Sequence, residues 1–446
     1  MENQEIILHN RFIEYANGSM EKISADDTPK VKQLRQEALK RFIDKGFPTK
    51  KMEKWRNSRM IECVNENYNI DSIEKKNHDF HCVIQNLDTE VVTLTNGMFS
   101  EDESIKTLSS GIVIGSTRKA MQQFPELFEK YFGTCNVNDV NGFYDINTAL
   151  WQDGFFIYAP KNAVAEKPIQ IIKIIDEENN PFIQTRNLII LETNSQLQII
   201  DCDDSIKEQS SFVNSYTEII IGENAQLDNY KLQNLNDNSS LLNTNTIKQL
   251  ANSRLQTHTI SFNGGKIRNN IFVDIDGEGA ESNLYGLYLV DKKQHVDNQL
   301  KVNHNVPNCN SNETFKGIID NEATAVFNGH VYVAPDADTA KVNAMPFLEI
   351  YADDVKCSHG STIGQLDQDA MFYMQQRGIS KDNARMLLMY AFAAEISNNI
   401  EIEALRERID DMIKRRLKGE LSCCENCVFQ CSTPKEYDFK IDLSKI

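Results

Sequence analysis

Between about residue 151 and residue 365, hydrophobic positions fall in short β-branched runs separated by polar turns. Runs such as FFIYAP, PIQIIKII, NLIILE and LQIID follow one another, and IFVDI and AVFNGHVYV come later, with no amphipathic helix between them. Many short strands with brief turns indicate a sandwich, a barrel or a stacked β-solenoid, whereas a doubly wound sheet would alternate strands with helices. The frequent Asn residues in the turns favour the solenoid, because Asn tolerates left-handed backbone and can stack between successive turns.

Residues 1–150 show a mixed, largely helical pattern. The stretch TPKVKQLRQEALKRFIDK has apolar residues at helical spacing, and Gly46 and Pro48 should end that helix. A second helical run follows in STRKAMQQFPELFEKYFG, and VVTLTNGMFS between the two predicts a strand and a turn.

Residues 366–446 return to helical spacing and form a third region. The helical runs are LDQDAMFYMQQRGIS, SKDNARMLLMYAFAAEISNNI and IEIEALRERIDDMIKRRLKGEL. Ser380 is suited to cap the second run, and basic residues close the third, where they favour a helix C-terminus. These helices either cap the end of the β region or dock a partner protein.

Composition and charge narrow the class of protein. The 446 residues are 40% hydrophobic and 25% charged, as in ordinary globular proteins, and the formal net charge is −18. That charge disfavours a main role in gripping nucleic acid or an anionic membrane surface. The polar, acidic start MENQEIILHN differs from a signal peptide, so we expect a cytoplasmic protein whose ten cysteines are mostly reduced thiols.

Common catalytic signatures are missing from the sequence. The nearest approach to a phosphate-binding loop, NGGKIR, lacks the upstream Gly and the following Ser or Thr, and no HExxH or nucleophile elbow occurs. Taken alone, His295, His304, His330 and Cys309 are more typical of satisfied polar residues in turns than of ligands. We therefore predict that the chain does not hydrolyse ATP by itself.

The stretch DDVKCSHGSTIGQL contains the residues best suited to metal or sulfur chemistry. On a strand, Cys357 and His359 share one face, with Ser358 between them on the other. An imidazolium lowers the pKa of a neighbouring thiol, and the two groups together offer soft and borderline ligands for iron or zinc. The spacing alone is equally consistent with a structural role, in which a buried Cys lies beside a hydrogen-bonded His.

Three stretches resemble the SufD subunits of the SUF iron–sulfur cluster assembly machinery. They are GFPTKKMEKWRNS, the long segment from ESNLYGLYLVDKKQHV to ATAVFNG, and YADDVKCSHGSTIGQLDQDAMFYMQQRGIS. The Cys-Ser-His-Gly sequence favours the D-type member of the SufB/SufD family, since SufB has a more acidic continuation after its cysteine.

The resemblance implies a right-handed parallel β-helix flanked by N-terminal and C-terminal helical regions. It also implies a scaffold that pairs through the β-helix with SufB, or with itself in isolation, and binds the ABC-type ATPase SufC through its C-terminal helices. Cys357 and His359 match family residues at the SufB–SufD interface, where a nascent iron–sulfur cluster forms, and no tightly bound cofactor is expected.

The second C-terminal run carries more bulky apolar residues than one buried stripe requires, which predicts that part of it faces SufC. The residues predicted to bind SufC are Met386, Leu387, Met389, Tyr390 and Phe392.

Two features depart from the family pattern. Near Asp338 and Thr339 the chain is shorter by about one β-helix turn, and the tail CCENCVFQC is not a general family feature. On a continued helix Cys424, Cys427 and Cys431 would share one face, so they are candidate ligands for zinc or iron. Core packing of these thiols explains them equally well.

Two rival functions come from other classes. A β-helical carbohydrate-active enzyme would need paired carboxylates or a calcium site in a surface groove. An autonomous metal-binding protein would need only the Cys-rich tail.

Overall fold

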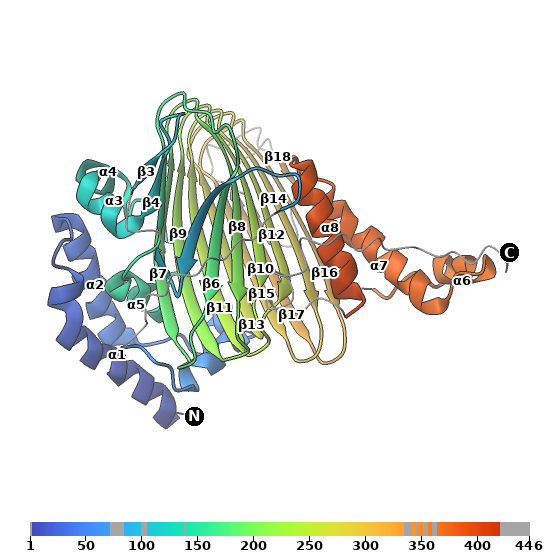
Figure 1. Cartoon of the computed structure of the whole chain (residues 1–446), viewed down its shortest axis with the longest axis horizontal. Helices are drawn as coiled ribbons and strands as arrows, with labels where there is room; N and C mark the ends of the chain where they lie inside the picture. The colour runs from blue at the N-terminus through green and yellow to red at the C-terminus, as the bar shows by residue number, and fades with distance from the viewer. Residues whose placement is uncertain are drawn as a thin grey trace.

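The computed structural model describes residues 2–71, 84–99, 105–137, 139–333, 341–343, 347–350, 356–358 and 364–419. Its centre is two ten-stranded sheets that face each other along the molecule (Figure 1). The first sheet has the order β2-β1-β6-β8-β10-β12-β14-β16-β18-β20, and the second has the order β19-β17-β15-β13-β11-β9-β7-β5-β4-β3. From β5 onward, consecutive strands alternate between the sheets and each pairs in parallel with the strand two places on, which makes a parallel β-solenoid. The predicted solenoid is confirmed, and the sandwich and barrel alternatives are wrong.

The strands of the first sheet are β1 (Glu90–Thr95), β2 (Met98–Phe99), β6 (Ile169–Ile175), β8 (Gln196–Ser205), β10 (Gln226–Asn234), β12 (Arg254–Asn263), β14 (Glu281–Val290), β16 (Asn310–Ile319), β18 (Lys341–Asn343) and β20 (Lys356–Ser358). Those of the second are β3 (Lys106–Thr107), β4 (Val113–Ser116), β5 (Phe155–Ala159), β7 (Phe182–Leu191), β9 (Ser211–Ile221), β11 (Ser239–Gln249), β13 (Lys266–Ile275), β15 (His295–His304), β17 (Thr324–Val333) and β19 (Phe347–Ile350).

Because the strands pair in register, side chains of the same kind stack in rows along the solenoid. One inward row of the second sheet consists of Ile189, Ile219, Ile247, Val273, Val302 and Val331, each paired with the next. All six are buried in the main apolar core between the sheets. Each buried aliphatic side chain contributes about 1.5–3 kcal/mol, so these rows supply much of the stability of the solenoid.

The turns are held by asparagines in left-handed backbone, as the sequence predicted. Asn162, Asn194 and Asn224 occupy equivalent corners with φ of 64°, 62° and 55°. The Asn194 side chain donates to Asn162 Oδ1 at 2.8 Å, and Asn224 donates to Asn194 Oδ1 at 3.1 Å. This ladder links consecutive turns through side chains as well as strands.

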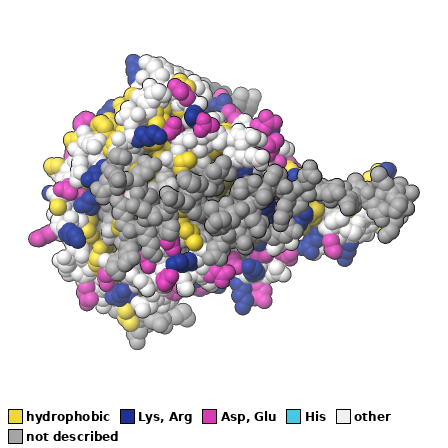
Figure 2. Space-filling view, viewed as in Figure 1, with side chains coloured by type: hydrophobic (Ala, Val, Ile, Leu, Met, Phe, Trp, Pro, Cys, Tyr) yellow, Lys and Arg dark blue, Asp and Glu magenta, His cyan; other side chains and the backbone are white. Residues whose placement is uncertain are grey.

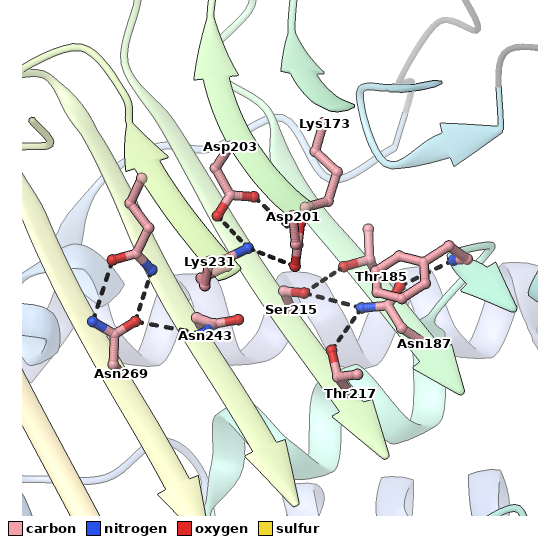
Figure 3. A network of polar contacts seen from close by, with 12 residues as sticks. Lys173, Thr185, Asn187, Asp201, Asp203, Ser215, Thr217, Lys231, Asn243 and Asn269 are labelled. Atoms are coloured by element: carbon pink, nitrogen blue, oxygen red, sulfur yellow. Dashed lines mark hydrogen bonds and ion pairs between the residues drawn. The ribbon is translucent and has the colours of Figure 1, made fainter. Parts of the chain in front are cut away.

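A buried polar band interrupts the apolar interior, which the sequence analysis did not predict (Figure 3). Lys231 Nζ lies 3.1 Å from Asp201, and Lys173 bridges to the same carboxylate at 2.7 Å. Asp203 completes the network by pairing with both lysines. In the next turns, amide and hydroxyl side chains continue the band through the Gln233–Asn269 hydrogen bond of 2.7 Å. Buried ionic groups seldom add stability over apolar packing, but removing one partner is costly.

The N-terminal helices cover the outer face of the second sheet (Figure 1). They are α1 (Glu2–Ile23), α2 (Pro29–Lys45), α3 (Thr117–Gln123), α4 (Pro125–Tyr131) and α5 (Gly142–Leu150), with two short 3₁₀ segments, η1 (Glu53–Trp55) and η2 (Arg59–Asn65). The predicted first helix is α2, which Thr28 caps and which ends at Gly46 with φ 63°. The second predicted run forms two helices rather than one, because Pro125 begins a new helix.

The C-terminal helices cover the outer face of the first sheet and then leave it. They are α6 (Gln368–Gln376), α7 (Lys381–Ser397) and α8 (Glu403–Leu417), and the predicted cap Ser380 accepts from Asn383 N. The inner side of α7 and α8 packs on outward residues of the first sheet. Figure 1 shows α6 and the start of α7 projecting from the solenoid as an arm.

His258 lies buried beneath the C-terminal helices. Its ring stacks between Tyr230 and Tyr285, at centroid distances of 5.2 and 4.8 Å. Neither ring nitrogen has a hydrogen-bond partner among the described residues. Burial lowers the pKa of His258 to about 3, so the ring is neutral at physiological pH.

Acidic and basic side chains are interspersed over the face seen in Figure 2. None of the described helices combines the length and the apolarity needed to cross a membrane.

We predict that Asn224→Ala lowers stability by about 1–2 kcal/mol, because Ala disfavours positive φ and removes the ladder amide. Asn224→Gly is the matched control, since it keeps the backbone conformation and loses only an exposed hydrogen bond. The midpoint of thermal unfolding measures both. Equal losses in the two variants would contradict a backbone origin.

We also predict that stability falls as pH drops from about 6.5 towards 3, because the unfolded chain binds a proton that folded His258 does not. One such group changes the free energy of unfolding by up to about 1.4 kcal/mol per pH unit. His258→Phe should remove one proton from this dependence and raise stability at pH 7. Thermal unfolding across this pH range, with and without the substitution, checks it; an unchanged slope would refute the assignment.

Candidate functional site

Cys357 lies in β20, the last described strand of the first sheet. It pairs with Val342 of β18, which pairs with Ser311 of β16. The strand predicted for this motif is therefore present at Cys357 and Ser358, whereas His359 lies outside the described residues. The pairing of Cys357 with His359 remains a prediction.

Register continues the Cys357 position back through the solenoid as a single row. Its earlier members are Leu197, Leu227, Leu255, Ser282 and Ser311. All five are buried, and the three leucines belong to the main interior core. The row thus changes from leucines to hydroxyl side chains at Ser282 and Ser311, and Val342 and Cys357 follow.

Ser311 of this row belongs to a small polar group in the interior. His304 Nε2 lies 2.9 Å from Ser311 Oγ, and Glu313 is two residues further along β16. Glu313 is 7% exposed and pairs in register with Leu284 of the core. Burial raises the pKa of Glu313 to about 8, which keeps the carboxyl largely neutral at pH 7. The sequence analysis missed Glu313, although its place in the alternation between Ser311 and Phe315 was a visible signal.

The other histidine and cysteine positions have structural partners. His295 Nε2 accepts from Arg59 N at 3.2 Å, and its Nδ1 lies 2.7 Å from Thr324 Oγ1. The Cys309 thiol is buried, 3.3 Å from the Gly277 carbonyl. These contacts confirm the interpretation of His295 and Cys309 as satisfied residues. The expected turn position is wrong for His295 and His304, which lie in β15, and for His330, which lies in β17.

Within the described ranges, no three His, Cys, Asp or Glu side chains converge as a ready-made metal site. Cys424, Cys427 and Cys431, the predicted tail ligands, lie outside those ranges, as do Asp338 and Thr339.

The rival carbohydrate-active enzyme would need a surface groove with paired carboxylates or a calcium site. An open cleft of about 280 Å³ lies between residues 53–58 and the outer face of β15 and β17. Of its two carboxylates, Asp297 is bound to Arg268 at 2.5 Å and to Gln299 at 2.6 Å. Glu53 is therefore left without a second available carboxylate in this cleft, so the cleft offers no support for that rival.

The residues predicted to bind SufC differ in exposure along α7. Met386, Leu387, Met389 and Tyr390 are half-buried, and Phe392 is 40% exposed. Tyr390 packs against the apolar cluster under α8, and the Lys316 ammonium covers the Phe392 ring at 4.4 Å.

The helix α6 carries two bulky side chains that the sequence analysis did not single out. Phe372 is 62% exposed and Tyr373 is 58% exposed, while their neighbour Met371 is buried. The exposed aromatic side chains of the arm are therefore those of α6, whereas Phe392 lies near the end of α7, beside Lys316 of β16.

The chain matches known proteins over nearly all of its described length. Residues 7–171 match the model of the SufBD protein N-terminal region, and residues 174–392 match that of the SUF system FeS cluster assembly SufBD core domain. An iron–sulfur cluster assembly SufBD family protein of Synechocystis sp. is 30% identical over 347 residues, 72% of this chain and 76% of that protein.

Two further relatives are also SufB/SufD-type assembly proteins. The iron–sulfur cluster assembly protein SufD of Escherichia coli is 26% identical over 413 residues, 89% of this chain and 95% of SufD. A SufBD family protein of Staphylococcus aureus is 26% identical over 332 residues, 70% of each chain. These matches confirm the predicted resemblance: the chain belongs to the SufB/SufD family of iron–sulfur cluster assembly proteins and is a homologue of SufD.

Proposed function

We propose that the protein is a non-catalytic scaffold subunit in the cytoplasm, which pairs with SufB and binds the ATPase SufC while a cluster is assembled. The observation that carries the proposal is the position of Cys357, in the last described strand of a sheet and in the row that continues the solenoid interior. A partner joined at this end would meet the thiol at the junction of the two interiors.

The ends of both sheets support pairing through the solenoid. Among the described strands, β20 and β19 each have a neighbour on one side only. An edge strand presents unpaired N–H and C=O groups that another chain can bind. SufB in the complex, or a second copy in isolation, is the proposed occupant.

Cys357 and His359 are the proposed contributors to the cluster. Their spacing places them on one face if the strand continues, and thiolate with imidazole suits iron. The cluster is the product passing through the interface rather than a resident cofactor, which explains a site with few ligands from this chain.

The projecting arm is the proposed SufC contact. It exposes Phe372 and Tyr373 and leads directly into α7 and α8, which pack on the first sheet. Movement of the ATPase would thereby reach the strands next to Cys357 through a continuous apolar contact.

We predict that Cys357→Ala and His359→Ala leave complex assembly intact but impair cluster formation, with His359→Ala more damaging, because histidine also moves a proton near neutral pH. Ser358→Ala is the matched control, since Ser358 continues the neighbouring row of the strand. Co-purification with SufB and SufC and the visible absorbance of the reconstituted cluster are the two measurements. A normal cluster yield from His359→Ala would rule out its participation.

We predict that Phe372→Glu, Met389→Glu and Phe392→Glu weaken co-purification with SufC about tenfold or more, because each places a charge in an apolar contact. Ile43→Glu is the control, since Ile43 is 45% exposed but lies on α2 at the other end of the molecule. SufB pairing and the melting temperature should not change. If SufC binding survives all three substitutions, its docking surface lies elsewhere.

A further inference from the structure

The segment from Lys40 to Arg56 is basic, although the protein is strongly acidic overall. It contains seven Lys or Arg residues and only two acids, Asp44 and Glu53, whereas the whole chain carries a formal net charge of −18. The segment runs from the last turns of α2, through the turn that follows the helix, to η1 and the residue after it. A local charge opposite to that of the rest of the molecule can steer and select a partner.

Most cations of this basic segment are exposed and lack a counter-charge. Among the described residues, no carboxylate forms an ion pair with the five that are exposed and named here: Lys40, Lys45, Lys50, Lys51 and Arg56. Arg41 differs, because it is paired with the buried carboxylate of Asp145 at 2.8 Å. The charge of the other five is therefore available to a partner.

Two aromatic side chains anchor the basic segment to the body of the protein. The ring of buried Phe47 lies 4.9 Å from that of Phe143 in α5. Trp55 is 1% exposed, and the Arg268 guanidinium lies 3.9 Å from the centroid of its ring. Arg268 also donates to the Lys54 carbonyl at 3.0 Å. The exposed cations are thus presented on a fixed backbone, which reduces the ordering cost of binding.

Apolar side chains and a cleft belong to the same surface. Ile43 is 45% exposed and Met52 is 46% exposed, and Ile43 lies one helical turn from Lys40. The open cleft of about 280 Å³ has Lys54 and Arg56 in one wall and the outer face of β15 and β17 opposite. An extended acidic chain with an occasional apolar residue would find cations, apolar contacts and a groove here.

We propose that the basic segment and the adjoining cleft dock an acidic segment of a protein partner. Two other polyanions fit this surface less well. Single-stranded nucleic acid binds through exposed aromatic rings, but Phe42, Phe47 and Trp55 of this segment are all buried. An anionic membrane would need a larger apolar face than Ile43 and Met52 provide.

The contacts proposed for SufB and SufC leave this surface free. The helix α2 lies at the opposite end of the molecule from the arm of α6 (Figure 1), and the cleft opens on an outer sheet face rather than at the edge of β19 or β20. A scaffold must receive iron and sulfur and release its product, so a carrier protein with an acidic surface is the expected partner. The choice of a carrier rests on the proposed function, whereas the docking surface itself does not.

A fluorescein-labelled oligoglutamate peptide is the probe, and fluorescence anisotropy measures its binding to the isolated full chain. We expect saturable binding that weakens roughly tenfold or more between about 20 and 150 mM salt, because exposed charges are screened by salt.

Lys50→Glu combined with Lys51→Glu should weaken peptide binding roughly tenfold or more, because two cations become anions beside the ligand. Arg56→Glu should weaken it as well, since Arg56 lines the cleft. The matched control is Lys161→Glu combined with Lys381→Glu, which makes the same change in net charge at exposed positions outside the segment. The control should bind the peptide nearly as the natural chain does. The melting temperature should be unchanged in every variant, because all the substituted side chains are exposed.

Unchanged affinity in the double variant at Lys50 and Lys51, or in Arg56→Glu, would overturn the proposal. An equal loss in the matched control would also overturn it, since net charge rather than this surface would then decide binding. Tighter binding of single-stranded DNA or of phosphatidylserine vesicles than of the peptide would show that the class of partner is wrong. Co-purification with SufB and SufC is measured separately on the same variants and should not change. Failure of the scaffold function and failure of this docking surface are thus distinguishable.

Discussion

The structure depends on one constraint, the parallel in-register pairing, from β5 onward, of each strand with the strand two places along the chain. Because register holds over whole strands, every inward side chain stacks on its equivalent from the previous turn. Each inward side chain therefore contacts its equivalent in the turn before and its equivalent in the turn after. This explains why the interior is organised as rows and why a polar residue in one turn is usually met by a polar residue in the next.

The pairing of polar side chains in the interior differs between the two ends of the solenoid. Near the first turns the band of Lys173, Asp201 and Lys231 is fully paired, and buried charges there satisfy one another. Near the last described full turn, Glu313 is buried without such a partner. A buried carboxyl without a hydrogen-bond partner is unusual in a folded core. The change from paired to unpaired groups coincides with the approach to Cys357.

The two outer faces of the solenoid serve different purposes. The N-terminal helices seal the second sheet with aromatic side chains such as Phe12, Phe143 and Phe212, which form one buried cluster. The C-terminal helices cover the first sheet above the buried His258 side chain, whose ring nitrogens have no hydrogen-bond partner among the described residues. The same helical region includes the projecting arm with its exposed aromatic side chains.

The sequence alone determined the class of each region, because local spacing and turn residues report local structure. The β-branched runs, the Asn turns, the capped helix after Ser380 and the break at Gly46 all follow from neighbouring residues and were found in the structure. Tertiary structure decided which residues meet across turns, since register brings together positions about thirty residues apart that no local pattern links. For that reason the Lys–Asp network, the burial of Glu313 and the exposure of Phe372 were not predicted. Cys357 could be singled out by its residue type, whereas its register position, in line with buried residues of earlier turns, became visible only when the strands were paired.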